Sequence, residues 1–204
     1  MIDFKLYLIT DRRVVRDNGI LSAVEEALSG GVRAVQLREK DLKIRELLDL
    51  AYRMRDLTKR YGALLFINDR VDVAIAVGAD GVHLGRDSIP PSAVRRVSND
   101  LIIGVSTHSV AEAIEAEKEG ADFITLGPVF YTPSKAGYGE PLGLNTLKKV
   151  CSSVSLPVLA IGGIKPDTIK EVIGSGAKGV AVISAILGAD NIKDAAEKFL
   201  RCLR

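Results

Sequence analysis

AVQLREKDLKIRELLDLAYRMRDLTKRYGALLFIN, residues 34–68, carries the repeating unit of the whole chain. It begins with AVQLR and ends with LLFIN, two short apolar runs of the kind found in strands that are covered on both faces. Between them lies ELLDLAYRMRDLTKRYG, which spaces its apolar residues at a helical period and ends on Gly62, a residue type common just past helix ends. The stretch therefore predicts a strand, a helix and a second strand.

The same unit recurs along the chain, with amphipathic segments such as AVEEALSGG (23–31) and AEAIEAEKEGAD (111–122) between apolar runs. The strand candidates are LYLIT 6–10, AVQLR 34–38, LLFIN 64–68, GVHLG 81–85, LIIGVS 101–106, DFITLG 122–127, PVLAIGG 157–163 and GVAVIS 179–184. Strand then helix, repeated in this way, predicts an α/β fold: a single-domain (β/α)₈ TIM barrel over residues 1–204. Residues 130–143, rich in Pro, Gly and Tyr, are the candidate active-site loop.

Composition and charge narrow the classes of partner. Hydrophobic residues make up 47% of the chain and charged residues 26%, the balance of a globular protein with a well-filled core. The net charge of +2 includes no basic run, so no nucleic acid is expected as a partner. No apolar segment approaches the ~20 residues of a membrane span, and the run before Thr10 is too short for a signal peptide.

Cysteine usage points to a compartment. Cys151 and Cys202 do not have the spacing of metal ligands, and two cysteines in apolar surroundings are more often reduced core residues than a disulfide. The sequence therefore predicts a cytoplasmic protein. Its oligomeric state stays open, with a homo-oligomer among the alternatives.

Polar residues collect where the first six strands end, which is where a barrel of this class carries its chemistry. Arg38, Lys40 and Lys135 would place three cations around one mouth, an arrangement that makes sense if an anion such as pyrophosphate offsets their repulsion. Asn68 and Asp69 have the oxygen atoms that Mg²⁺ prefers, with phosphate oxygens and water completing its shell. The alternative is that these residues form ordinary ion pairs at the rim.

The last two strands end differently, in Ile161-Gly162-Gly163-Ile164 and in Ile183-Ser184-Ala185. Glycine lets a phosphate approach backbone N–H groups, and a short helix beginning at Ser184 would direct its positive end to the same place. This combination predicts a phosphate site between strands seven and eight. The alternative is that the glycines serve only tight turns.

The two histidines differ in their setting. His83 lies inside the apolar run GVHLG, which favours a buried structural role. His108 follows the end of strand five, close to Ser106, and is a candidate acid or base near neutral pH. A histidine that merely begins a helix is the alternative reading for His108.

Seven motifs follow one another over practically the entire chain: QLREK 36–40, IND 67–69, GVHLG 81–85, GVSTHS 104–109, GPVFYTPSK 127–135, IGGI 161–164 and ISAI 183–186. In their order and spacing they resemble the thiamine phosphate synthase and thiazole tautomerase family. The resemblance implies a transferase that joins hydroxymethylpyrimidine diphosphate to a thiazole phosphate, with Mg²⁺ as cofactor, and releases pyrophosphate and thiamine phosphate. Both substrates are small phosphorylated molecules.

The resemblance also implies roles for individual residues. The diphosphate would be held by Gln36, Arg38, Lys40, Asn68 and Lys135, with Asp69 as a Mg²⁺ ligand and Ser106 near the pyrimidine. The thiazole phosphate would be held by Thr132, Ser134, Gly162, Gly163, Ile183 and Ser184. The candidate catalytic residues are then Ser106, Lys135 and His108.

Two positions depart from the synthase pattern. Synthases usually have a second Mg²⁺-binding aspartate where this chain has Ser88, and Asp87, one residue earlier, is the candidate replacement. The loop TPSKAGYGEPLG, residues 132–143, is more similar to that of the metal-independent thiazole tautomerases, in which the histidine matching His108 moves the proton. The synthase is the preferred hypothesis, the tautomerase is the alternative, and a non-catalytic binding protein of the thiamine pathway is a minor one.

Overall fold

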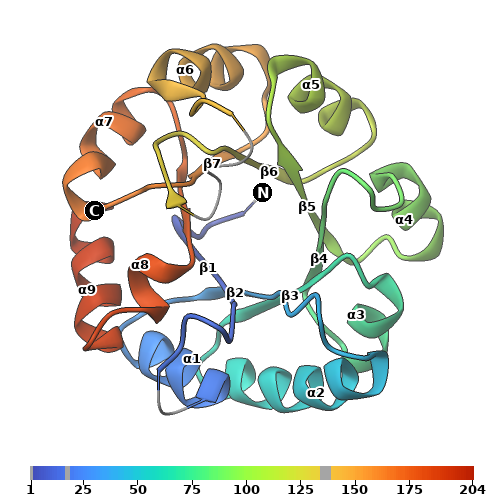
Figure 1. The fold of residues 1–204 in the computed structure, drawn as a ribbon. Coiled ribbons are helices and arrows are strands. Elements are labelled where there is room, and N and C mark those ends of the chain that lie inside the picture. The colour runs from blue at the N-terminus through green and yellow to red at the C-terminus, as the bar shows by residue number, and fades with distance from the viewer. Residues whose placement is uncertain (1, 17–18, 134–138) are drawn as a thin grey trace.

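The computed structural model describes residues 2–16, 19–133 and 139–204, and in these ranges the strands form a closed parallel barrel in chain order (Figure 1). The first strand pairs with the last, with Leu8 beside Val182. The strands are β1 (Leu6–Ile9), β2 (Ala34–Leu37), β3 (Leu64–Asn68), β4 (Gly81–Leu84), β5 (Ile102–Thr107), β6 (Phe123–Leu126), β7 (Val158–Ile161) and β8 (Gly179–Val182). The predicted fold class is confirmed.

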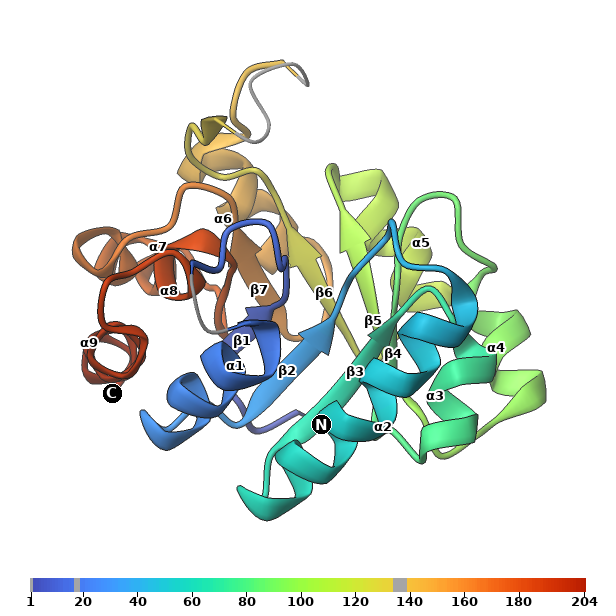
Figure 2. The ribbon, with the colours of Figure 1, turned by 60° about the horizontal axis from the view of Figure 1, so that its bottom comes forward.

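Helices surround the barrel and connect each strand to the next (Figures 1 and 2). They are α1 (Gly19–Ser29), α2 (Ile44–Arg60), α3 (Val71–Val77), α4 (Pro91–Val97), α5 (Val110–Lys118), α6 (Gly143–Ser153), the 3₁₀ turn η2 (Pro166–Thr168), α7 (Ile169–Gly174), α8 (Ser184–Leu187) and α9 (Ile192–Cys202). None of the helices in the described ranges is both long and apolar enough to span a bilayer.

Strand alternation divides the core into two layers. Residues such as Leu6 and Leu8 point outward and join the apolar faces of the helices, whereas Tyr7 and Ile9 point into the barrel. The barrel interior is filled mainly by aromatic rings, with Tyr7, Phe66 and Phe123 in edge-to-face contact at centroid distances of 5.3 to 5.6 Å. Each such pair contributes roughly 0.5–1.5 kcal/mol beyond its buried area. The interior is therefore a packed core, and any ligand must bind at one of its ends.

Observed strands are one to three residues shorter than most of the predicted runs, because the residues at the ends of those runs already belong to the connections that follow. Arg38 and Gly85 lie just beyond β2 and β4, and Ser184 already begins α8. Residues 127–133 and 139–142, between β6 and α6, stand at the end of the barrel toward which the strands point (Figure 2). Residues 134–138 of the candidate loop 130–143 lie outside the described residues, so its role stays a prediction.

Candidate active site

A cavity of about 1220 Å³ opens at the carboxyl ends of the strands. The predicted site residues that line it are Gln36, Arg38, Asn68, Ser106, His108, Thr132, Gly162, Gly163, Ile183 and Ser184. Lys40, Asp69 and Asp87 are described but do not line it, and Ser134 and Lys135 lie outside the described residues. The barrel thus brings ten positions, taken from six different strand ends or loops, around one space.

Strand pleating explains why Arg38, Asn68 and Ser106 face this space. Successive side chains of a strand point to opposite sides, so a residue two positions beyond an inward-facing one also faces inward. Asn68 follows the interior residue Phe66 in this way, and Ser106 follows Gly104. These polar side chains are therefore the uppermost inward-facing positions of their strands, directly above the apolar interior.

The β1 and β2 ends form a charged side of the cavity. The backbone N–H of Arg38 donates to Thr10 Oγ1 at 2.9 Å, which ties the two strand ends together. Among the described residues, no carboxylate forms an ion pair with the Arg38 guanidinium. Asp11 instead pairs with Arg13, Nε to Oδ1 at 2.8 Å, and this hydrogen bond is the main reason why the pKa of Asp11 is lowered. Arg38 is thus left to meet an anion from the cavity.

Asp69 has an unusual backbone. Its φ is 60°, the one positive value among the non-glycine residues that the structure describes. The N–H of Arg70 donates to the carbonyl of Asn68 at 2.7 Å, so Asp69 is the central residue of a tight three-residue turn. A left-handed aspartate is strained by roughly 1–3 kcal/mol, and such strain concentrates at functional sites. The turn directs the Asp69 carboxylate toward the β4 end.

Three donors fix that carboxylate. Its Oδ1 accepts the Ser88 hydroxyl and the Gly85 N–H, the latter at 3.2 Å, and its Oδ2 accepts Asn68 Nδ2 at 2.6 Å. Ser88, and not the exposed Asp87, is therefore the residue that lies against Asp69. Within the described ranges, no group of three or more His, Cys, Asp or Glu side chains lies close enough to hold a metal ion.

The β7 and β8 ends form a side of the cavity made of backbone. Gly162 and Gly163 have φ values of 93° and 66°, and a Cβ atom on Gly163 would lie 2.5 Å from the Tyr131 carbonyl oxygen. Glycine is thus required at Gly163 by conformation and by space. Ser184 begins α8, whose first N–H groups have no acceptor within the helix. The predicted phosphate-binding elements lie together on one wall of the cavity.

A chain of buried polar side chains forms the floor beneath Ser106. Gln36 Nε2 donates to Tyr7 Oη at 3.2 Å, Tyr7 Oη lies 3.5 Å from His83 Nδ1, and His83 Nε2 lies 3.0 Å from Ser106 Oγ. Burial raises the pKa of Tyr7 and lowers the pKa of His83 to about 3, so both side chains are neutral. His83 is 2% exposed, which confirms its predicted burial.

His108 follows β5, three strands along the barrel from the β2 end that carries Arg38. Its Nδ1 is 3.1 Å from Glu112 Oε2, and the same carboxylate oxygen accepts the His108 N–H at 2.7 Å. Ser109, the next residue, caps α5 by accepting the Glu112 N–H at 3.1 Å. His108 therefore both precedes a helix and lines the cavity, so its two sequence-based readings are compatible.

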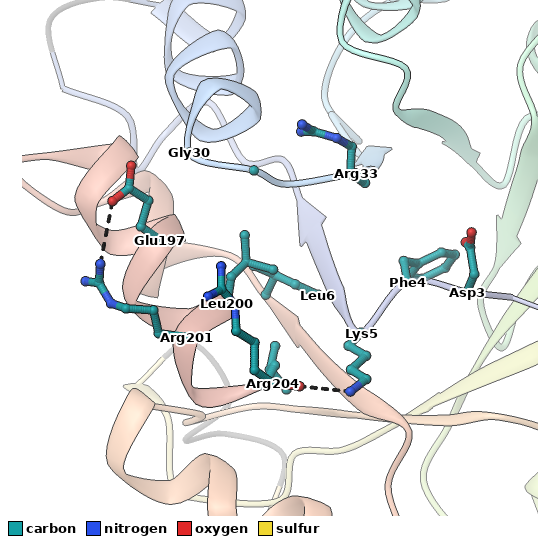
Figure 3. Close-up of a pocket in the computed structure, with 12 residues that line it drawn as sticks. Asp3, Phe4, Lys5, Leu6, Gly30, Arg33, Glu197, Leu200, Arg201 and Arg204 are labelled. Atoms are coloured by element: carbon teal, nitrogen blue, oxygen red, sulfur yellow. Dashed lines mark hydrogen bonds and ion pairs between the residues drawn. The ribbon is translucent and has the colours of Figure 1, made fainter.

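A second cavity, of about 800 Å³, lies at the other end of the barrel between the start of β1, the α1–β2 turn and α9 (Figure 3). Its cations already serve the fold. Lys5 Nζ donates to the Leu203 carbonyl at 3.0 Å, Arg33 donates to two backbone carbonyls, and Arg201 lies 3.6 Å from Glu197. Because these groups hold chain ends and helix ends together, this cavity is a structural feature and the candidate active site is the other one.

Sequence reasoning did not single out Tyr7 or Arg13. Tyr7 forms part of the cavity floor, and Arg13 lines the cavity. The available signal for Tyr7 was its position, two residues before Ile9 in the same strand, since the two side chains point to the same side. Arg13 had no such signal, because residues beyond a strand end lose the alternation that predicts direction.

Comparison with known proteins gives a consistent family assignment. Residues 6–186 match the family model described as thiamine monophosphate synthase. A putative thiamine-phosphate synthase from Geobacter sulfurreducens is 52% identical over 203 residues, 99% of this chain and 95% of that protein. A thiamine-phosphate synthase from Pyrococcus furiosus is 46% identical, over 95% of this chain and 92% of that protein.

Solved structures agree with the sequence comparison. Thiamine phosphate pyrophosphorylase from Pyrococcus furiosus superimposes with a TM-score of 0.89 at 44% identity, over 98% of this chain and 95% of that chain. A 3-hexulose-6-phosphate synthase superimposes with a TM-score of 0.71 at 19% identity, over 98% of this chain and 100% of that chain. The second likeness is one of fold alone.

Proposed function

Because the chain belongs to the thiamine monophosphate synthase family, it is a transferase that forms thiamine phosphate, and we propose which of its residues perform the reaction. The observation that supports the assignment best is that one cavity has two different sides that are chemically suited to anions. Arg38 lies on one, and the backbone of Gly163 and Ser184 lies on the other. An enzyme that joins two phosphorylated substrates needs both sides to face a common space.

The charged side is the proposed site of the pyrimidine diphosphate. Arg38 and Asn68 line it, and Lys40 and Lys135 are the further proposed ligands of the diphosphate. Gln36 already donates to Tyr7, so its proposed contribution is to the floor on which the pyrimidine lies, beside Ser106. Departure of pyrophosphate breaks the C–O bond and leaves a pyrimidine cation, and the fixed charges of these side chains stabilise the leaving group.

The backbone side is the proposed site of the thiazole phosphate. Its phosphate would accept hydrogen bonds from the N–H groups at Gly163 and Ser184, with Gly162, Thr132, Ser134 and Ile183 beside it. This places the thiazole ring across the cavity from Arg38, where its nitrogen can form the new C–N bond with the pyrimidine cation. The two phosphorylated ends stay apart while the two rings meet in the middle.

Mg²⁺ is the proposed cofactor, and the site offers it one well-fixed protein carboxylate, that of Asp69. Asp69 is held by donors on both oxygens, so its remaining lone pairs keep a fixed direction, as a cation ligand requires. Asp87 is the proposed second contact, although its side chain is exposed and Ser88 is the neighbour of Asp69. When bound, the ion would neutralise charge that develops on the diphosphate.

One assay tests the proposed function. The protein is incubated with hydroxymethylpyrimidine diphosphate, thiazole carboxylate phosphate and Mg²⁺, and thiamine phosphate is measured. Formation of thiamine phosphate that requires all three components supports the assignment.

A second candidate is favoured by the position of His108, which lines the cavity and is oriented by Glu112. A thiazole tautomerase would rearrange the thiazole substrate with neither pyrimidine nor metal present.

Phosphate alone is expected to bind at the backbone side. Crystals grown with phosphate or sulfate should show the anion in contact with N–H groups near Gly163 and Ser184, because these need no second substrate to be in place. The measurement is the electron density at both sides of the cavity. An anion found only beside Arg38 would contradict the assignment.

Replacing Ser88 by aspartate is expected to tighten Mg²⁺ binding about tenfold and to raise turnover. The Ser88 hydroxyl contacts Asp69, so a carboxylate at this position would give the ion a second anionic ligand. Isothermal titration with Mg²⁺ and pyrophosphate measures the affinity. Ser88→Asn is the matched control, of similar size but uncharged, and should show no gain. If Ser88→Asp changes neither affinity nor rate, Asp87→Ala decides whether Asp87 already supplies that ligand.

The proposed cellular location rests on the two cysteines. Free Cys151 and Cys202 are compatible with a reducing cytoplasm, which is the proposed location. The proposed partners are small phosphorylated molecules, and a homo-oligomer stays a prediction for size measurements in solution.

A further inference from the structure

Tyr7 and His83 lie beneath the cavity and have no place in the proposed chemistry. Both are buried, at 0% and 2% exposure, above an apolar cluster that includes Phe66 and Phe123. A barrel needs no polar groups at this level, since aliphatic side chains fill such interiors equally well. The hydrogen bonds of these two side chains run in a single line that ends at Ser106, on the surface of the cavity. This arrangement indicates that the two side chains act on Ser106, where the hydrogen bonds reach the cavity.

In this chain of hydrogen bonds, the contact between Gln36 and Tyr7 determines which atom donates to which. Gln36 Nε2 donates to Tyr7 Oη at 3.2 Å, which uses a lone pair of the hydroxyl and leaves its hydrogen to find another acceptor. Among the described residues, the acceptor within reach of that hydroxyl is His83 Nδ1, at 3.5 Å. His83 Nδ1 therefore bears a lone pair and no hydrogen.

A neutral imidazole has one donor and one acceptor nitrogen, so a bare Nδ1 requires a hydrogen on Nε2. His83 Nε2 lies 3.0 Å from Ser106 Oγ and 3.5 Å from Thr125 Oγ1, and the shorter contact is with Ser106. Burial disfavours the charged form of His83 and lowers its pKa to about 3, which agrees with a neutral ring. Ser106 thus accepts a hydrogen bond from below.

The ring of His83 is also held in place sterically. Its centroid lies 5.7 Å from the ring centroids of both Tyr7 and Phe123. Gly104 leaves the space for the imidazole, because a Cβ atom there would lie 2.6 Å from His83 Nδ1. The imidazole therefore cannot move aside to change its partners.

We propose that Tyr7 and His83 are positioning residues that make Ser106 a hydrogen-bond donor toward the substrate. With His83 donating to Ser106 Oγ, the Ser106 hydrogen is free to point into the cavity. In the opposite tautomer, Ser106 would donate its hydrogen to His83 Nε2 and would present only lone pairs to the cavity. On the proposed function, which this inference rests on, the group selected is an aromatic ring with an unprotonated nitrogen facing Ser106.

The tautomer of His83 is measurable in the ligand-free protein. The chain has two histidines, so ¹⁵N-histidine labelling gives two imidazoles, and His108→Asn identifies the signal of His83. Long-range ¹H–¹⁵N correlation should show a protonated Nε2 and a bare Nδ1. Tyr7→Phe keeps the ring and removes the hydroxyl, so it should shift His83 toward the other tautomer. Thr125→Val is the matched control and should leave the tautomer unchanged. A protonated Nδ1 in the unaltered protein overturns the proposal.

Kinetics test whether the effect passes through Ser106. Tyr7→Phe should lower kcat/KM about five- to tenfold, and Ser106→Ala by at least as much. In the Ser106→Ala background, adding Tyr7→Phe should cost less than about twofold, because the hydroxyl that Tyr7 orients is already gone. Equal losses in both backgrounds, in variants whose thermal unfolding is unchanged, would show that Tyr7 acts by another route and overturn the proposal.

The experiments distinguish a wrong proposed function from a wrong positioning role of Tyr7 and His83. If the unaltered protein forms no thiamine phosphate, the proposed function is wrong, yet the ¹⁵N spectra still decide the direction of the hydrogen bonds. If thiamine phosphate forms but Nδ1 carries the hydrogen, the function stands and the positioning role of Tyr7 and His83 is wrong.

Discussion

Asp69→Ala is expected to lower the turnover of thiamine phosphate formation roughly 100- to 1000-fold, the largest effect on activity that we predict for a single site. Asp69 is the proposed metal ligand, and its carboxylate is held by Asn68, Gly85 and Ser88. Folding should lose only about 1–2 kcal/mol, because the side chain is half-buried and its three hydrogen bonds lie at the rim of the barrel and not in the core. Steady-state kinetics at saturating Mg²⁺, together with urea unfolding, measures both quantities.

Asp69→Asn separates the charge from the backbone conformation. Asparagine tolerates the left-handed φ of 60° as aspartate does, so this variant should fold as the unaltered protein does and still lose most activity. His108→Ala is the contrasting variant, and its turnover should fall less than about fivefold if proton transfer by His108 is not needed. An essential His108 with a dispensable Asp69 would move the assignment to the tautomerase.

Gly104→Ala is expected to destabilise the fold by about 3 kcal/mol, the largest stability effect that we predict. A Cβ atom at this position would lie 2.4 Å from Phe123 Cζ and 2.6 Å from His83 Nδ1, and both rings are confined inside the barrel. Neither ring can yield without disturbing the aromatic contacts around it. Thermal unfolding measures the change, which should lower Tm by roughly 6–12 °C for a chain of this size.

Gly174→Ala is the matched control for that substitution. Gly174 is the last residue of α7, and a Cβ atom there would meet nothing within 4 Å. Alanine has the higher helix propensity and restricts the unfolded chain, so this variant should gain about 0.5–1 kcal/mol. If Gly104→Ala proved as harmless as Gly174→Ala, the interior would be far less tightly packed than the distances around Gly104 require.

The fold could be predicted from the sequence because a single rule repeats. Each strand run, such as LLFIN at residues 64–68, is apolar on both faces and is followed by a segment of helical period, and eight such units are the composition of a closed parallel barrel. Because the carboxyl ends of all the strands meet at one end of such a barrel, the polar residues that follow them lie around the same space. Arg38, Asn68 and Ser106 line the same cavity for that reason.

The rest depended on contacts that a one-dimensional pattern does not encode. Ser88 reaches Asp69 across the β3 and β4 ends because Asp69 adopts a left-handed turn, a conformation that aspartate tolerates but does not by itself predict. The link from Tyr7 to His83 joins β1 to β4 across the barrel interior. Sequence predicts which side of a strand faces inward, but it does not tell which inward residues meet.

The pairing of β1 with β8 has a consequence for how the protein is made. Leu6 can pair with Val180 only after the residues between them have been made, which at ~5–20 residues per second means a delay of roughly 9–35 s. During that interval the nascent chain exposes the edge of β1, and the rings of Tyr7 and Phe123 have no enclosure. A ribosome-bound chain halted before β8 should therefore be sensitive to proteases and bound by chaperones, and catalytic competence should arise at the moment of ring closure.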